Sequence, residues 1–307
     1  MSIVFVTPGR RIEKLADRLK ALDPSIETEV WPEVKNPDGV LAAAVWQHPP
    51  GVLSSFPNLK FVSSLGAGVD HVLRDQQLPE ALPVTRIADE KLKLGMRRFV
   101  LGAVLNYEHQ FFMFNEQKKN SNWYQKLRYR KEIVAGVMGL GYLGADLAYS
   151  LGQLNYKVKG YSNTLRKIPK VQTYSREELN DFLQDLSVLI CLLPLTDQTK
   201  GILNMELFSR LPAQCYLINV ARGAHLVETD LLKALEMGQL IGAWLDVFQE
   251  EPLPPKHPFW QHPDIMVTPH IASITDPDEA AGQLVENYHR MLRKEALLNQ
   301  VDRQRQY

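Results

Sequence analysis

A glycine-rich loop between a short apolar run and an amphipathic segment constrains the fold of this chain more than any other feature. Residues 133–138 are largely apolar, and Gly139-Leu-Gly141-Tyr-Leu-Gly144 follows them directly. Apolar side chains then recur every three or four residues, which predicts a helix with one buried face. In such a strand–loop–helix unit the glycines allow a tight turn, a close approach of pyrophosphate to the backbone, and close helix–strand packing. The pattern predicts a dinucleotide-binding unit, and the alternative is a tight turn that holds no ligand.

Short apolar runs alternate with amphipathic stretches along almost the whole chain, which is typical of parallel α/β sheets. A second α/β series is expected from residue 133 to about residue 268. The expected strands before it are residues 3–7, 40–46, 60–64 and 84–87, and the expected helices outside it are residues 11–22, 95–117 and 278–298.

The chain has 307 residues, which is enough for two domains with separate cores. The last expected helix needs a packing partner, and the first α/β series can supply it, which makes that domain discontinuous. We therefore expect two doubly wound parallel-sheet domains: a Rossmann domain at residues 97–274, inserted in a flavodoxin-like domain formed by residues 1–96 and 275–307.

Composition excludes several classes of partner. Thirty-five basic residues balance thirty-five acidic ones, so the chain carries no net positive charge that would favour binding to nucleic acid or to an anionic membrane. Cys191 and Cys215 both lie in apolar runs, which predicts buried thiols in a reducing cytoplasm. The chain shows neither a charged-then-apolar leader nor an apolar run near the ~20 residues that a membrane helix needs. We expect a cytoplasmic protein without a metal site.

The segment after the second expected strand of the Rossmann domain favours one form of the cofactor. NAD-binding proteins usually carry an acidic residue there for the ribose 2′-hydroxyl, whereas this chain has Ser162 and Asn163. No carboxylate repels a 2′-phosphate at this place, and Arg166 and Lys167 can bind one. The sequence predicts NADPH as the cofactor, with NADH weaker. Alternatively, the two cations only solvate a loop.

Three polar residues follow strand-like runs of the second α/β series. Arg222 follows residues 216–220, and Glu251 and His270 each come just after a later strand-like run. Residues past the carboxyl ends of parallel strands line the ligand crevice, where an arginine is a bidentate partner for a carboxylate. Each residue alone has a structural alternative, namely a capped helix, a surface charge or a buried histidine.

The ordered series of motifs resembles the D-isomer-specific 2-hydroxyacid dehydrogenases, and most closely their glyoxylate/hydroxypyruvate reductase A branch. The resemblance covers nearly the whole chain. Its motifs are the glycine loop, VWQHPP (45–50), SLGAGVD (64–70), LLP (192–194), NVARG (219–223), LDVFQEEPLP (245–254), FWQHPDIMVTPHIASIT (259–275) and QVDRQR (300–305).

The resemblance implies a catalytic role for each of Arg222, Glu251 and His270. Arg222 would bind the substrate carboxylate and polarise the 2-keto oxygen. His270 would protonate that oxygen as hydride arrives from the nicotinamide, and Glu251 would favour the imidazolium by accepting its hydrogen bond. The implied reaction is NADPH-dependent reduction of small 2-oxo acids, glyoxylate to glycolate and hydroxypyruvate to D-glycerate.

The resemblance also assigns binding residues. The amides of Gly68 and Val69 would receive the substrate carboxylate, and Trp46 would wall the pocket unless it is an ordinary core tryptophan. The implied cofactor contacts are Met96, Gly139, Gly141, Tyr142, Leu143, Gly144, Ser162, Asn163, Arg166, Lys167, Leu193, Pro194, Val220, Ala221 and Asp246.

One stretch departs from the family pattern and leaves alternatives open. Lys93, Arg97 and Arg98 add positive charge before and within the long helix, and they either favour a second anionic group on the substrate or face water. If they favour a second anionic group, the substrate would be a dicarboxylic 2-keto acid. A bulkier 2-keto acid is a further alternative. A third hypothesis, from another class, is a nucleotide-sensing corepressor or scaffold on the same fold.

The family resemblance further implies a homodimer through the nucleotide-binding domain, with a polar arm at residues 121–129 embracing the partner. The basic residues in and near this arm form either a solvated surface or a phosphate or subunit contact. They are Lys118, Lys119, Lys126, Arg128, Arg130 and Lys131.

Overall fold

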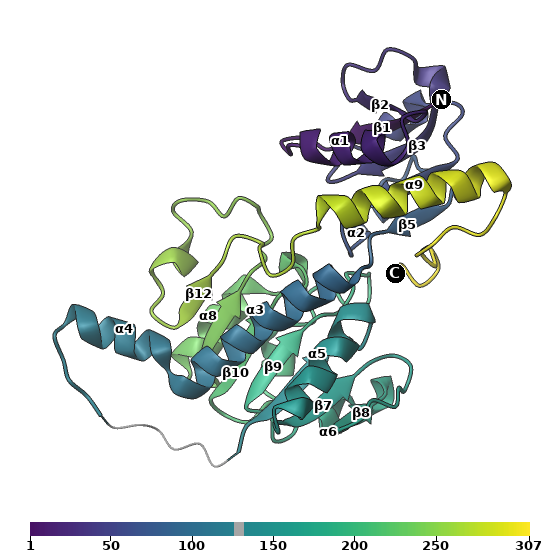
Figure 1. The fold of residues 1–307 in the computed structure, drawn as a ribbon. Coiled ribbons are helices and arrows are strands. Elements are labelled where there is room, and N and C mark those ends of the chain that lie inside the picture. Colours follow the sequence, from purple (N-terminus) through teal and green to yellow (C-terminus); the bar gives the residue numbers. More distant parts are fainter. Residues whose placement is uncertain (126–131) are drawn as a thin grey trace. The chain divides into compact units, whose positions relative to one another are not determined.

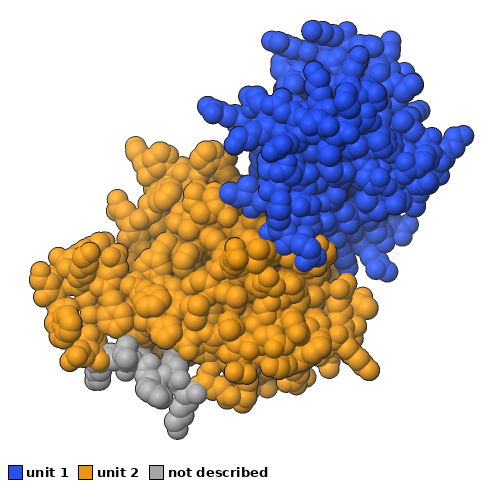
Figure 2. All heavy atoms as spheres, viewed as in Figure 1, with its two compact units in different colours: residues 1–92, 274–307 blue, residues 93–273 orange. Residues whose placement is uncertain are grey.

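The computed structural model describes residues 1–125 and 132–307, so four of the basic arm residues, Lys126, Arg128, Arg130 and Lys131, lie outside it. The chain divides into two compact units (Figure 2). Unit 1 comprises Met1–Leu92 and Ile274–Tyr307, and unit 2 comprises Lys93–Ser273. No helix among the described residues is long and apolar enough to cross a membrane.

Unit 1 is built on a five-stranded, wholly parallel sheet with the order β2-β1-β3-β4-β5 (Figure 1). This is the flavodoxin-like order, as the sequence predicts. Its strands are β1 (Ser2–Val6), β2 (Glu27–Val30), β3 (Val40–Val45), β4 (Phe61–Ser64) and β5 (Val84–Arg86). All but β2 were expected from apolar runs; β2 reads ETEV and is an edge strand with no buried residue, so it carries no such signal.

The helices of unit 1 include one from each end of the chain. They are α1 (Glu13–Leu22), α2 (Asp70–Leu73) and α9 (Pro277–Arg293), with 3-10 turns at Pro37–Gly39 and Val52–Ser55. Helix α9 packs beside α1 (Figure 1). The last helix therefore packs on the first α/β series, as we expect from the sequence. Asp276 caps α9 by accepting the amides of Asp278 and Glu279. The prediction that this helix continues to residue 298 was wrong, because Lys294 adopts a left-handed conformation (φ 56°) that ends it.

Unit 2 contains a seven-stranded, wholly parallel sheet with the order β12-β11-β10-β9-β6-β7-β8. The order reverses between β6 and β9, which is the Rossmann switch point where a crevice opens at the carboxyl ends. The strands are β6 (Val134–Met138), β7 (Lys157–Tyr161), β8 (Val171–Tyr174), β9 (Val188–Cys191), β10 (Cys215–Asn219), β11 (Leu240–Leu245) and β12 (Ile265–Val267). The two sheets confirm the predicted fold class.

The helices of unit 2 follow the α/β alternation. They are α4 (Phe111–Lys119), α5 (Tyr142–Gln153), α6 (Leu179–Leu183), α7 (Met205–Phe208), α8 (Glu228–Glu236) and all but the first turn of α3 (Glu90–His109), with 3-10 turns at Arg176–Glu178, Gly223–His225 and Pro258–Gln261. The single helix expected at residues 95–117 is two helices. Gln110, with φ 56°, separates α3 from α4.

Successive residues of the central strands enter two different hydrophobic clusters, one on each face of the unit 2 sheet. Leu217 belongs to one cluster and Ile218 to the other, and both are fully buried. This explains why the strands read as continuous apolar runs. Cys191 and Cys215 lie in the first cluster, and burial raises the pKa of the Cys191 thiol to about 12, which keeps it protonated.

Candidate functional site

His270 and Glu251 form the central pair of the candidate site. Glu251 follows β11 and His270 follows β12, and these strands are parallel neighbours, so their carboxyl ends lie side by side. His270 Nδ1 lies 2.7 Å from Glu251 Oε2, and the two side chains are 30% and 34% exposed. Because a carboxylate only accepts, Nδ1 carries the proton of this hydrogen bond. The opposite ring nitrogen, Nε2, is then the atom placed to exchange a proton with a ligand.

The Glu251 carboxylate is held in its ionised form. Burial opposes ionisation, but the hydrogen bond from His270 and a 3.0 Å hydrogen bond from the Phe248 amide outweigh it. The positive charges of His270 and Arg222 act in the same direction, and the pKa of Glu251 is lowered below its ordinary value. Glu251 is therefore a carboxylate at neutral pH.

The backbone of His270 is left-handed (φ 54°), and Asp246 holds it there. The Asp246 carbonyl accepts the His270 amide at 2.8 Å. The fully buried Asp246 carboxylate accepts the Ile271 and Ala272 amides at 2.9 and 2.8 Å and the Thr268 hydroxyl at 2.7 Å. Burial nevertheless raises the pKa of Asp246 above its ordinary value. The Asp246 carboxylate thus anchors the loop that carries His270. The sequence predicts Asp246 as a cofactor contact, and this contact stays a prediction.

Arg222 leaves β10 in extended conformation and is fixed from both sides. The buried Asn219 amide group accepts from the Ala221 amide at 3.2 Å and donates to the Arg222 carbonyl at 3.0 Å. A Cβ on Gly223 would lie 1.9 Å from the Phe248 carbonyl carbon, so only glycine lets this loop approach the segment after β11. Since Phe248 also donates to Glu251, the arginine and glutamate segments are packed as one body.

The glycine loop has the geometry of an anion cradle. Gly139 has φ 102°, and a Cβ on Gly144 would lie 1.8 Å from the Gly139 carbonyl oxygen. By contrast, a Cβ on Gly141 would have no heavy atom of the described residues within 4 Å. Gly141 is also the N-cap of α5, which has neither a side-chain cap nor an acidic residue in its first turn. Uncapped amides at a helix N-terminus, reached across open space, fit a pyrophosphate.

Further predicted cofactor residues follow strands next to β6. Ser162 follows β7, and its hydroxyl donates to the Thr164 carbonyl at 2.7 Å. Asn163, Arg166 and Lys167 are exposed, and within the described residues neither cation has an ion-pair partner. Leu193 and Pro194 follow β9, Val220 and Ala221 follow β10, and Tyr142 and Leu143 open α5, all at the carboxyl edge of the sheet; Met96 is buried in α3.

Unit 1 brings the predicted substrate residues together. Trp46 follows β3, and Gly68 and Val69 follow the neighbouring strand β4. A Cβ on Gly66 would lie 2.6 Å from the Trp46 ring, so a glycine is required where this loop meets the tryptophan. The Arg10 guanidinium stacks over the Trp46 ring, with its Cζ 3.9 Å from the ring centroid.

Comparisons with known proteins identify the family of this chain. Residues 101–272 match the family model described as D-isomer specific 2-hydroxyacid dehydrogenase, NAD binding domain. The chain is also 41% identical to glyoxylate/hydroxypyruvate reductase A of Photorhabdus laumondii, over 98% of each chain. This chain belongs to the D-isomer-specific 2-hydroxyacid dehydrogenase family.

Solved structures of this dehydrogenase family are similar over the full length. A family member from Xanthobacter autotrophicus in complex with NADPH and MES has a TM-score of 0.94 at 37% identity, covering 100% of this chain and 99% of its own. An NADPH-dependent glyoxylate/hydroxypyruvate reductase from Sinorhizobium meliloti in complex with NADP and sulfate has a TM-score of 0.93 at 34% identity, with the same coverage.

Some residues that build the candidate site were not predicted from the sequence. Thr268 links the Trp244 indole, which donates to it at 3.1 Å, to the Asp246 carboxylate. The buried ring of His225 has its two nitrogens 3.2 and 3.3 Å from the carbonyls of Arg222 and Pro194. The only sequence signal for these residues is that each lies within three positions of a predicted site residue.

The basic residues that depart from the family pattern differ in their surroundings. Lys93 Nζ lies 4.2 Å from the centroid of the Tyr142 ring, and Arg97 pairs with Asp146 at 3.4 Å. Both contacts join α3 to α5 within unit 2. Arg98 is exposed. Thus two of the three cations interact with the helix that follows the glycine loop.

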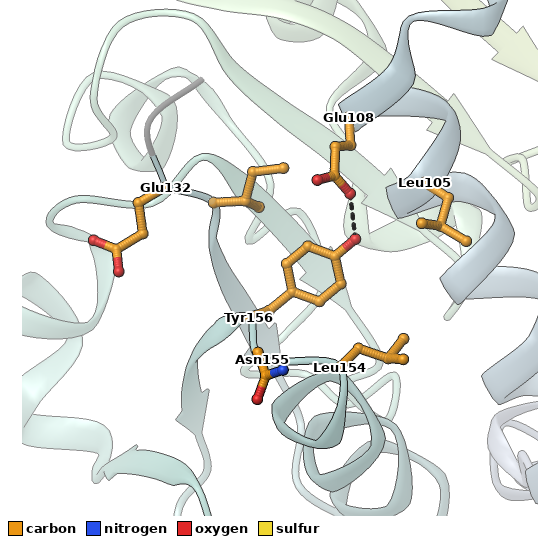
Figure 3. A pocket seen from close by; sticks show the side chains of 7 residues that line it. Leu105, Glu108, Glu132, Leu154, Asn155 and Tyr156 are labelled. Carbon is orange, nitrogen blue, oxygen red and sulfur yellow. Dashed lines mark hydrogen bonds between the residues drawn. The ribbon is translucent and has the colours of Figure 1, made fainter. Parts of the chain in front are cut away.

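A pocket in unit 2 lies apart from these residues (Figure 3). Asn155 and Tyr156 precede β7 and Ile133 precedes β6, so the pocket opens at the amino ends of the strands, opposite the glycine loop. The Tyr156 hydroxyl donates to Glu108 at 2.5 Å, and the two side chains point toward one another (Figure 3). None of the predicted site residues lines this pocket.

Replacing Glu251 with glutamine tests the ionised pair. Because the folded-state pKa of Glu251 is lowered, its ionisation stabilises the fold above the unfolded pKa of about 4.3, and this stabilisation is lost as the pH falls through the folded pKa. We expect the stability difference between wild type and Glu251→Gln in urea unfolding to shrink below about pH 4. Glu250→Gln, at the exposed neighbouring position, is the control and shows no such trend. A difference for Glu251→Gln that stays constant to lower pH contradicts the assignment.

Proposed function

We propose that this chain is an NADPH-dependent reductase of small 2-oxo acids, which reduces glyoxylate to glycolate and hydroxypyruvate to D-glycerate. The observation that carries the proposal is the 2.7 Å contact of His270 with an ionised Glu251, beside Arg222 and on the strand edge that carries the glycine loop. The names of the Photorhabdus and Sinorhizobium relatives support the same substrates.

His270 is the proton donor in this proposal. When bound, the reduced nicotinamide supplies the hydride, which adds to the 2-keto carbon of the substrate. The keto oxygen gains negative charge as this happens, and the His270 Nε2 proton neutralises it. Glu251, bound to Nδ1, keeps the ring oriented and stabilises the imidazolium before the transfer. In the oxidation direction the same nitrogen accepts the proton.

Arg222 has two tasks in the proposed reaction. Its guanidinium binds the substrate carboxylate, for which a planar fork of N–H groups is suited. It also polarises the keto oxygen and stabilises the developing alkoxide, an interaction that strengthens toward the transition state. The backbone on either side of Arg222 is fixed, and Arg222 Nη1 donates to the Ala221 carbonyl at 2.7 Å, which helps to position the guanidinium.

The cofactor assignment rests on the two loops after β6 and β7. The open cradle at Gly141 and the uncapped N-terminus of α5 suit the pyrophosphate. The exposed Arg166 and Lys167, with no carboxylate between them and Ser162, suit a 2′-phosphate. The relatives from Xanthobacter and Sinorhizobium were solved with NADPH and NADP. We assign NADPH as the cofactor, NADH as a weaker substitute and reduction as the direction.

The remaining assignments concern the domains and the assembly. Unit 1 presents the substrate through the Gly68 and Val69 amides and the Trp46 wall, and unit 2 binds the cofactor. The protein acts in the cytoplasm, which suits two buried cysteine thiols that form no disulfide. It is a homodimer through the nucleotide-binding unit, where Phe111 and Trp123 expose 58% and 87% of their surfaces. Light scattering at micromolar concentration tests the dimer, and the mass of one chain contradicts it.

Replacing His270 with glutamine tests the reaction. We expect NADPH oxidation with glyoxylate or hydroxypyruvate to fall by about 10²–10⁴-fold in kcat, while the Kd for NADPH stays near the wild-type value. His262→Gln, whose ring accepts the Asp264 amide in the loop before β12, is the matched control and keeps wild-type activity. A His270→Gln variant with normal turnover refutes the proton-donor role. Wild-type protein that binds NADPH but reduces neither acid refutes the proposed reaction.

Replacing both Arg166 and Lys167 with serine tests the cofactor preference. Loss of two charge-assisted contacts to a 2′-phosphate predicts a KM for NADPH at least about tenfold higher, with the KM for NADH unchanged. Steady-state kinetics with each cofactor at saturating glyoxylate measures both values. Equal changes for the two cofactors, or wild-type efficiency with NADH at least as high as with NADPH, contradicts the assignment.

A further inference from the structure

We propose that Ser64 and His71 are positioning residues for the substrate carboxylate. A neutral His71 acts through the Ser64 hydroxyl and so sets the direction of the loop amide that receives this carboxylate. This inference rests on the proposed function, which places the carboxylate at the loop after β4. The residues involved all belong to unit 1, and none of them touches the reacting atoms in the proposed mechanism.

The Ser64 hydroxyl is the centre of the loop's hydrogen bonds. It donates to the Gly68 carbonyl at 2.7 Å. It also accepts the Gly66 amide at 3.3 Å and lies 3.0 Å from His71 Nε2. A hydroxyl has one proton and two acceptor lone pairs, so these three contacts use its full capacity. Because its proton goes to Gly68, the bond with His71 must be donated by Nε2.

The other nitrogen of His71 confirms which form of the ring fits. The Gln47 amide donates to His71 Nδ1 at 3.3 Å, so Nδ1 is an acceptor and carries no proton. The ring is therefore neutral, with its proton on Nε2. His71 and Ser64 are buried, with 1% and 0% of their surfaces exposed. Each hydrogen bond of this series therefore has a fixed donor and acceptor: Gln47 donates to His71, His71 to Ser64, and Ser64 to Gly68.

The chain of hydrogen bonds determines where the amide of Val69 points. In a trans peptide, the C=O of one residue and the N–H of the next lie on opposite sides of the bond. Since the Gly68 carbonyl faces Ser64, the Val69 N–H faces away from Ser64. Within the described residues, the amides of Gly68 and Val69 have no hydrogen-bond partner. These are the two amides assigned to the substrate carboxylate.

The same imidazole also fixes the tryptophan wall. Gln47, which donates to His71, has a left-handed backbone (φ 49°) directly after Trp46. The rings of Trp46 and His71 lie 4.9 Å apart, and the Trp46 ring abuts Gly66 on the other loop. One buried histidine thus connects the loop after β3 to the loop after β4. Loss of this connection is expected to weaken carboxylate binding rather than the hydride and proton transfers.

A pair of neighbouring serines provides the test. Ser63 and Ser64 are both buried on β4, but among the described residues the Ser63 hydroxyl has one hydrogen bond, to the Ser64 carbonyl at 3.4 Å. For Ser64→Ala we expect a KM for glyoxylate about tenfold higher, with kcat and the Kd for NADPH within about twofold of wild type. Ser63→Ala is expected to keep the wild-type KM. Isothermal calorimetry with oxalate and the NADP+-loaded protein should show the same tenfold loss for Ser64→Ala alone.

Two variants of His71 separate positioning from folding. His71→Leu removes both ring nitrogens and is expected to raise the KM for glyoxylate as Ser64→Ala does. His71→Asn retains a donor and an acceptor and is expected to recover part of the loss, at a melting temperature no higher than that of His71→Leu. Equal KM values for Ser63→Ala and Ser64→Ala overturn the inference while the proposed function stands. A wild-type protein that neither reduces glyoxylate nor binds oxalate overturns both.

Discussion

The buried carboxylate of Asp246 is the constraint on which the candidate site depends. A left-handed backbone at a residue other than glycine is uncommon and needs support from its surroundings. Asp246 gives His270 this support through its carbonyl and through three hydrogen bonds from the following amides and Thr268. The resulting loop turns the imidazole toward Glu251. Burial raises the pKa of Asp246, and these three hydrogen bonds to its carboxylate offset part of that effect.

Neighbouring strands convert this local arrangement into a site. Arg222, Glu251 and His270 are far apart in sequence but follow β10, β11 and β12, which are consecutive in the sheet. Gly223 admits the Phe248 backbone, and Phe248 donates to Glu251, so a displacement of one segment is transmitted to the next. In unit 1, His71 has the corresponding task of joining two loops at the carboxyl edge of the other sheet. In both units a buried polar group sets the shape of a functional loop.

Much of this architecture could be predicted from the sequence because it depends on local patterns. Apolar runs gave β1, β3, β4 and β5, and the glycine loop placed β6 and α5. The edge strand β2, the break at Gln110 and the end of α9 at Arg293 could not be predicted, since polar edge positions and left-handed residues leave no periodic signal. The contacts of Thr268 and His225 were also missed, because they join segments that only the folded sheet brings together.

The central claim is that Asp246 holds His270 in its working orientation, and Asp246→Asn tests it most directly. An amide in place of the carboxylate turns an NH2 group toward the Ala272 or Ile271 N–H, which displaces the loop with little change in volume. The kcat for glyoxylate reduction and the Kd for NADPH should be measured on the same folded preparation. The account predicts a kcat lower by about a hundredfold with the Kd within about threefold of wild type. A variant that keeps the wild-type kcat would contradict it.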